Sequence, residues 1–76
     1  MPSLSELPLD RRAEIRSLET RGDMRRRLQD LGFVPGAVVR PLFRGGTGDP
    51  TAYLVSGAVI ALRREDAGEI LVRYLQ

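Results

Sequence analysis

The sequence contains no cysteine and no histidine, and all twelve of its basic residues are arginine. Without cysteine the chain has no disulfide framework, thiolate zinc site or iron–sulfur cluster. Without histidine it lacks the commonest general base and the commonest transition-metal ligand. Without lysine it has no Schiff-base or P-loop lysine chemistry. These absences argue against an enzyme and favour a binding module.

Long apolar runs are also missing. The longest apolar run is 58–62, preceded by Ser56-Gly57, and a membrane span needs roughly 18 apolar residues. The first six residues have neither the basic start nor the apolar stretch of a secretory signal. We therefore expect a cytoplasmic protein that does not insert into the membrane.

The chain has 76 residues, of which 42% are hydrophobic, and a formal net charge of +2. This length predicts one domain over residues 1–76, with a thin core. The charge is uneven, because residues 11–44 hold nine arginines against four acidic residues, a local charge of +5. We expect a cationic face in the first half of the chain.

A short helix is predicted over Asp23–Leu31. Asp23 follows a glycine and is a favourable N-cap residue. Met24, Leu28 and Leu31 recur at intervals of four and three residues, which places them on one inward-facing stripe. The predicted helix is too short to be stable alone, so it must pack on a larger element.

The end of this helix carries a strong local signal. Gly32 stands where a left-handed C-terminal cap is needed, and Phe33 then falls where a Schellman motif packs it on Leu28. Pro35 and Gly36 form a turn out of the cap. All of these residues are assigned structural roles.

The rest of the chain predicts short strands. Alternating or β-branched segments lie at 13–19, 38–44, 52–55, 59–63 and 70–75. Turns are expected at 45–50 and at Ser56-Gly57, a capping box at 3–6, and one helical turn at 64–68. Five short strands favour a small closed barrel, because closure removes exposed edges. Pro41 belongs on an edge or at a bulge, because it cannot donate to a ladder.

Several ordered blocks resemble the FeoA family. They are Arg-Arg-Arg-Leu-Gln-Asp-Leu-Gly-Phe-Val-Pro-Gly at 25–36, Gly-Asp-Pro at 48–50, residues 57–67 and Leu-Ser-Glu-Leu at 4–7. The resemblance implies a mainly β, SH3-like barrel of about five strands with a short α-helix. It further implies a cytosolic accessory protein of FeoB, a membrane transporter that imports ferrous iron and carries a GTPase domain.

The family also offers an alternative and two departures. The same fold unit occurs as the C-terminal domain of some iron-dependent repressors, although this chain has no helix-turn-helix segment. Residues 10–12 stand where a turn glycine is expected, and Pro41 stands where an apolar strand residue is usual.

Carboxylates carry little chemistry in this sequence. Between Gly48 and Pro50, Asp49 is most simply a turn residue whose side chain accepts backbone N–H bonds. The acidic group at 65, 66 and 69 is interpreted as solvated, since ferrous iron generally takes imidazole as well as carboxylate. We therefore expect no catalytic residue, no cofactor and no metal site.

Arg25, Arg26 and Arg27 are the candidate partner interface. Arg26 is expected to point to solvent and the other two to flank the apolar stripe. Ion pairs are predicted between Asp23 and Arg27 and between Arg26 and Asp30. The run is either a solvated helix face or a docking patch for an acidic partner, since guanidinium groups bind carboxylates well.

The strand face around Phe43 and Tyr53 is the second candidate interface. A small RNA- or DNA-binding barrel remains the rival function, although only four aromatic residues are present and no stacking platform is evident. The chain is expected to be a monomer or a weak homo-oligomer.

Overall fold

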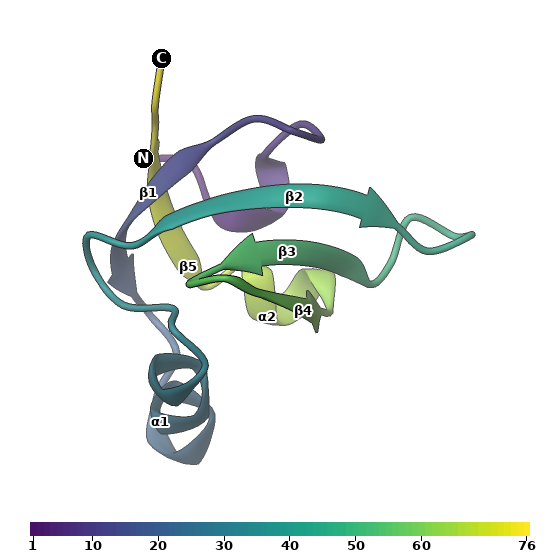
Figure 1. The fold of residues 1–76 in the computed structure, drawn as a ribbon. Helices are drawn as coiled ribbons and strands as arrows, with labels where there is room; N and C mark the ends of the chain where they lie inside the picture. The colour runs from purple at the N-terminus through teal and green to yellow at the C-terminus, as the bar shows by residue number, and fades with distance from the viewer.

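The protein is mainly β, with one short helix standing below a curved sheet (Figure 1). A computed structural model describes all 76 residues. The elements are η1 (Leu4–Glu6), β1 (Ala13–Leu18), α1 (Gly22–Asp30), β2 (Val38–Arg44), β3 (Thr51–Val55), β4 (Ala58–Leu62), α2 (Arg64–Ala67) and β5 (Ile70–Tyr74). Each predicted strand is present, with ends that differ by one residue at most. Neither α-helix has the length and apolar character needed to cross a membrane.

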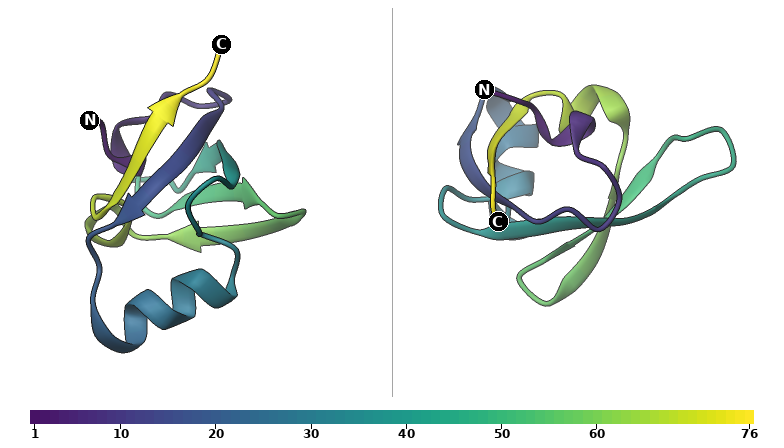
Figure 2. Two further views of the ribbon diagram at one scale, coloured as in Figure 1. Left: turned by 90° about the vertical axis from the view of Figure 1, so that its left-hand side faces the viewer. Right: turned by 90° about the horizontal axis from the view of Figure 1, so that it is seen from above.

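The five strands form one antiparallel sheet in the order β4-β3-β2-β1-β5. The two ends of this order do not pair, so the predicted closure of the barrel is wrong. The sheet instead curls around the core, and the single turn of α2 connects β4 to β5 (Figure 2). Because the ladder stays open, β4 and β5 are both edge strands. Each therefore has one side whose main-chain N–H and C=O groups do not bond to another strand of this sheet.

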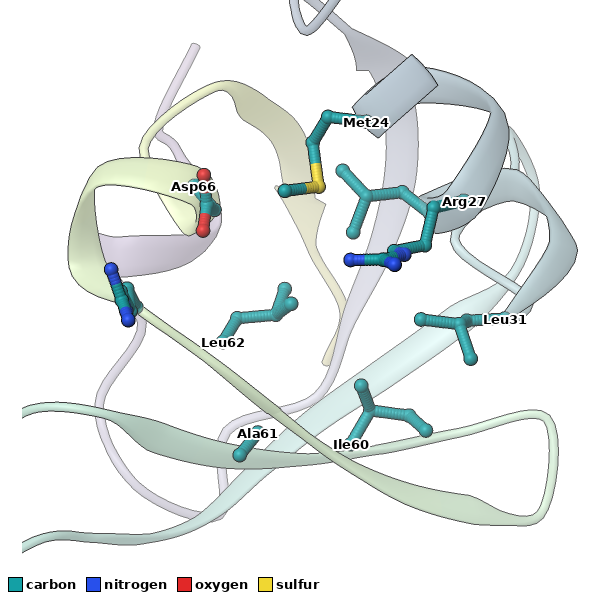
Figure 3. A pocket seen from close by; sticks show the side chains of 9 residues that line it. Met24, Arg27, Leu31, Ile60, Ala61, Leu62 and Asp66 are labelled. Atoms are coloured by element: carbon teal, nitrogen blue, oxygen red, sulfur yellow. The ribbon is translucent and has the colours of Figure 1, made fainter.

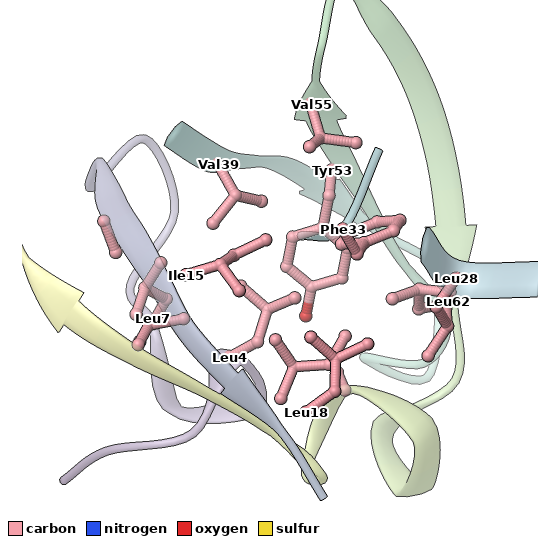
Figure 4. Packing of buried hydrophobic residues seen from close by; sticks show 14 residues of the cluster. Leu4, Leu7, Ile15, Leu18, Leu28, Phe33, Val39, Tyr53, Val55 and Leu62 are labelled. Atoms are coloured by element: carbon pink, nitrogen blue, oxygen red, sulfur yellow. The ribbon is translucent and has the colours of Figure 1, made fainter. Parts of the chain in front are cut away.

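The inner face of the sheet and the helices enclose one core of 14 buried hydrophobic residues (Figure 4). Leu4 and Leu7 from the N-terminal turn close one end, and both are almost fully buried. Leu28 and Phe33 close the other end from α1 and the segment after it. The Ser3–Glu6 capping box is present, as predicted, and holds the N-terminal turn in shape.

Helix α1 ends as the sequence predicts but begins differently. The N–H of Phe33 donates to the carbonyl of Leu28 at 2.9 Å, and the N–H of Gly32 donates to the carbonyl of Gln29 at 3.0 Å. With Gly32 at a φ of 111°, these bonds form the expected Schellman motif. Asp23, however, is not the N-cap residue. Arg21 holds that position, and Asp23 lies within the first turn, where its charge still favours the positive end of the helix.

Pro41 lies in β2 beside a bulge. The β2–β3 register shifts between Pro41 and Phe43, in agreement with the bulge alternative. The carbonyl of Pro41 accepts the N–H of Asp10 at 2.7 Å, beyond the end of β1. Since the N and O atoms of a strand residue point to the same side, the missing N–H of Pro41 costs no bond to β3. Asp10 itself has a φ of 66°, which explains why a glycine was expected in that turn.

Candidate functional site: a groove between α1 and β4

A groove with a volume of about 400 Å³ separates α1 from β4 (Figure 3). Helix α1 forms one wall, β4 forms the other, and α2 closes one end. The lining residues are Met24, Arg27, Leu28, Leu31, Ile60, Ala61, Leu62, Arg63 and Asp66.

The floor of the groove is apolar and continuous with the core. Leu28 and Leu62 are buried core residues, while Met24 and Ile60 are partly buried and pack against them. Leu31 is 36% exposed, so its predicted place in the core is wrong. Leu31 follows the last helical residue as the C-cap of α1, and it lines the groove.

Two arginines, Arg27 and Arg63, line the groove together with one carboxylate, Asp66. Arg27 makes neither the predicted ion pair with Asp23 nor any other. The Arg63 guanidinium lies 3.9 Å from Glu65, and both side chains are about three-quarters exposed. An exposed pair at this distance contributes little. Both guanidinium groups are therefore available to a carboxylate from outside.

The three consecutive arginines have separate surroundings. Nη1 of Arg25 donates to the carbonyl oxygens of Leu18 and Thr20 at 2.5 and 3.3 Å. The head group of Arg25, one of the predicted interface residues, is therefore held by the segment that precedes α1. Arg26 is exposed as expected, and its predicted ion pair with Asp30 is not formed. Only Arg27 lines the groove.

The two residues of the second candidate interface, Phe43 and Tyr53, also have different surroundings. Phe43 is 60% exposed near the end of β2, whereas Tyr53 is only 3% exposed and belongs to the core. Burial raises the pKa of the Tyr53 phenol above its ordinary value. Tyr53 therefore cannot serve as an interface residue in the folded protein, and its prediction as one is wrong.

Asp49 has a more specific structural role than a turn residue. Its Oδ1 accepts the backbone N–H of Arg64 at 2.9 Å, at the first position of α2. The turn that contains Gly48 and Pro50 thus caps a helix that begins 15 residues later. This bond positions the end of the groove that α2 closes.

The groove lining consists of six apolar residues, two arginines and one aspartate. No group of three or more histidine, cysteine, aspartate or glutamate residues gathers anywhere in the structure in a way that could hold a metal ion. The sequence predicts a strand that contains Ile60 and Ala61, but it does not indicate that this strand lines a groove. A signal was present, because 58–62 is the longest apolar run and strands at an open edge normally carry a charge.

Comparison with known proteins identifies the family. The model of the FeoA domain matches residues 3–74. A fusion protein of Porphyromonas gingivalis, named for Fe(2+) transport protein A and the Fe(2+) transporter FeoB, is 36% identical over 72 residues. The match covers 95% of this chain but 8% of that protein, so the chain spans less than a tenth of the relative's length.

Solved structures agree with the fold. The FeoA protein of Chlorobium tepidum is 39% identical and superposes with a TM-score of 0.92, covering 97% of this chain and 70% of that one. FeoA of Stenotrophomonas maltophilia, solved with zinc and described as an SH3 domain protein, is 36% identical with a TM-score of 0.84. That match covers 95% of this chain and 89% of the other. The predicted SH3-like fold is thereby confirmed.

Proposed function

This chain belongs to the FeoA domain family, and we propose that it is an accessory protein of bacterial ferrous iron uptake that acts by binding a FeoB-type transporter. The relative from Porphyromonas gingivalis supports the partnership, because its name joins the transport protein and the FeoB transporter in one polypeptide. Fusion keeps two domains at a high effective concentration, which favours partners that bind one another. The chain is not proposed as an enzyme, since FeoA is a family of transport accessory domains.

The observation that carries the proposal is the groove between α1 and β4. Its apolar floor is accessible, and its lining holds Arg27 and Arg63 against one carboxylate, Asp66. Arg27 forms no ion pair, and the contact of Arg63 with Glu65 is long and exposed. Apolar contacts supply affinity at the centre of an interface, while charges at its edge steer association and select the partner. The arrangement fits a cytosolic surface of the transporter that presents apolar side chains flanked by carboxylates.

Binding to the transporter tests the proposal. The cognate FeoB-type protein, reconstituted in nanodiscs, should retain the chain at physiological salt. Replacing Arg27 and Arg63 together by Glu should weaken this binding and lower ferrous iron uptake in cells. The matched control replaces Arg21 and Arg26 by Glu, since both are exposed and neither lines the groove.

The two double variants carry the same change in net charge. A difference in their binding to the transporter therefore depends on where the changed charges lie. Equal weakening would mean that only overall charge matters. Undiminished binding of the Arg27 and Arg63 variant, with its fold confirmed by circular dichroism, would place the contact surface outside the groove.

A further inference from the structure

One edge of the sheet is covered by another part of the chain, and the other edge is open. The edge of β5 is covered by the N-terminal segment, through a bridge between Ser3 and Leu71 and a bond of 2.9 Å from the N–H of Val72 to the carbonyl of Pro2. Strand β4 has no neighbour on its outer side. It is therefore the one edge of this sheet that remains free to pair.

The β3–β4 hairpin determines which backbone groups of β4 face outward. Ser56 and Gly57 form its two-residue turn, with φ angles of 50° and 79°, as a type I′ turn requires. The residues that flank such a turn, Val55 and Ala58, form a hydrogen-bonded pair. Bonded pairs then alternate along the regular register, so Ile60 and Leu62 also bond to β3.

The remaining residues of β4 direct their main chain away from the sheet. The N–H and C=O groups of Val59 and Ala61 point to the open side, where the chain supplies no partner for them. Val59 is also 55% exposed at its side chain. The strand thus presents two N–H groups and two C=O groups in the spacing that another strand needs.

None of the usual devices protects this edge. Strand β4 reads Ala-Val-Ile-Ala-Leu, with no charge and no proline, and its ladder with β3 has no bulge. Open edges in monomeric proteins normally carry one of these features, because an exposed regular apolar edge invites pairing with another chain. An unprotected edge beside a groove indicates a surface that is meant to be paired.

We propose that an extended segment of the partner adds to β4 as a sixth strand, pairing with the main chain of Val59 and Ala61. The inference rests on the proposed function and specifies its mode of binding. Alternate side chains of the added strand would face the groove beneath α1, where Met24, Leu31 and Ile60 offer apolar contact. Strand addition of this kind takes affinity from the main chain and specificity from alternate side chains.

Charge selects the occupant. Arg27 and Arg63 line the groove that the added strand would border. Because every second side chain of that strand faces the groove, its groove-facing positions should carry carboxylates as well as apolar side chains. A second copy of this chain would instead bring another Arg27 and Arg63 to the same edge, which disfavours self-pairing. The proposed ligand is therefore an acidic, amphipathic strand of the transporter.

Proline at position 59 isolates the main-chain contribution. Val59→Pro removes an N–H that points outward, so the ladder with β3 stays intact. Val59→Thr is the matched control, because it keeps the N–H and the β-branched shape. The proline variant should bind the reconstituted transporter about tenfold more weakly than the threonine variant.

Hydrogen exchange on the wild-type chain gives a second, mutation-free measurement. The amides of Ile60 and Leu62 should be protected in the free protein, and those of Val59 and Ala61 should gain protection only in the complex. Equal binding of both variants, with no gain of protection, overturns strand addition and leaves docking in place. Failure of the wild-type chain to bind overturns both proposals. A dimer of the isolated chain that Val59→Pro abolishes would make a second copy the occupant and overturn the acidic strand.

Discussion

The guanidinium group of Arg25 donates a hydrogen bond of 2.5 Å to the main-chain carbonyl of Leu18, the last residue of β1. A second bond from the same nitrogen reaches the carbonyl of Thr20. One side chain therefore ties the first turns of α1 to the segment that leads into it. The run of three arginines is consequently not one functional unit, because only Arg26 and Arg27 are left to meet solvent or a partner.

Removing this tie should destabilise the domain. Arg25→Ala should lower the free energy of unfolding by about 1.5–3 kcal/mol, because bonds to a charged donor are lost and two carbonyls lose a partner. Arg26→Ala should stay within about 0.5 kcal/mol of the parent, since its side chain is exposed. Urea unfolding measures both. Equal stability of the two variants would contradict the structural role of Arg25.

The two leucines at the end of α1 should differ sharply. Leu28→Ala should cost about 2–5 kcal/mol, since the residue is 1% exposed and its loss leaves a cavity. Leu31→Ala should cost about 1 kcal/mol or less, because the side chain lines the open groove. Thermal denaturation of both variants tests this order, and a reversed order would show that the helix is rotated.

The carboxylate of Asp49 should stabilise the protein by capping α2. Asp49→Ala removes the acceptor for the N–H of Arg64 and should cost about 1 kcal/mol, as the loss of a helix N-cap does. Asp49→Asn keeps an oxygen acceptor and should recover most of the loss. Chemical denaturation distinguishes the two, and an alanine variant as stable as the parent would remove Asp49 from the capping role.

Stability should fall at acidic pH through Glu14. Hydrogen bonds from Arg73, the shorter 2.8 Å, lower the pKa of this carboxyl below its ordinary value of 4.5. A carboxyl with a lowered folded-state pKa stabilises the protein fully above 4.5, and the contribution is lost as pH falls toward the folded value. Glu14→Gln should therefore flatten the decline of the melting temperature below pH 4.5. An unchanged pH profile would show that the ion pair is not linked to folding.

Ferrous iron should find no stoichiometric site on the isolated chain. The sequence has no imidazole or thiol, and the structure gathers no group of three carboxylates. Anaerobic titration calorimetry at micromolar protein should show no one-to-one binding. A saturable site that disappears on replacing Glu65 or Glu69 by Gln would contradict this expectation.

The sequence alone predicts the features that depend on neighbouring residues. The Schellman end of α1 depends on residues 28–33 alone, and the type I′ turn on two adjacent residues, so local backbone preferences determine both. The strand segments were equally readable, because alternation and β-branched residues mark them within a few positions. The family resemblance rested on the same ordered local blocks.

Long-range relationships required the tertiary structure. Whether the sheet closes depends on the geometry of strands far apart in sequence, and the open order left β4 unpaired. Tyr53 and Phe43 both lie in the paired strands β2 and β3, yet Tyr53 is 3% exposed and Phe43 is 60% exposed. Arg25 looks like its neighbours in sequence, and only the position of the Leu18 carbonyl gives it a structural role. Turns, caps and strand segments follow from neighbouring residues, but burial and edge exposure are properties of the assembled sheet.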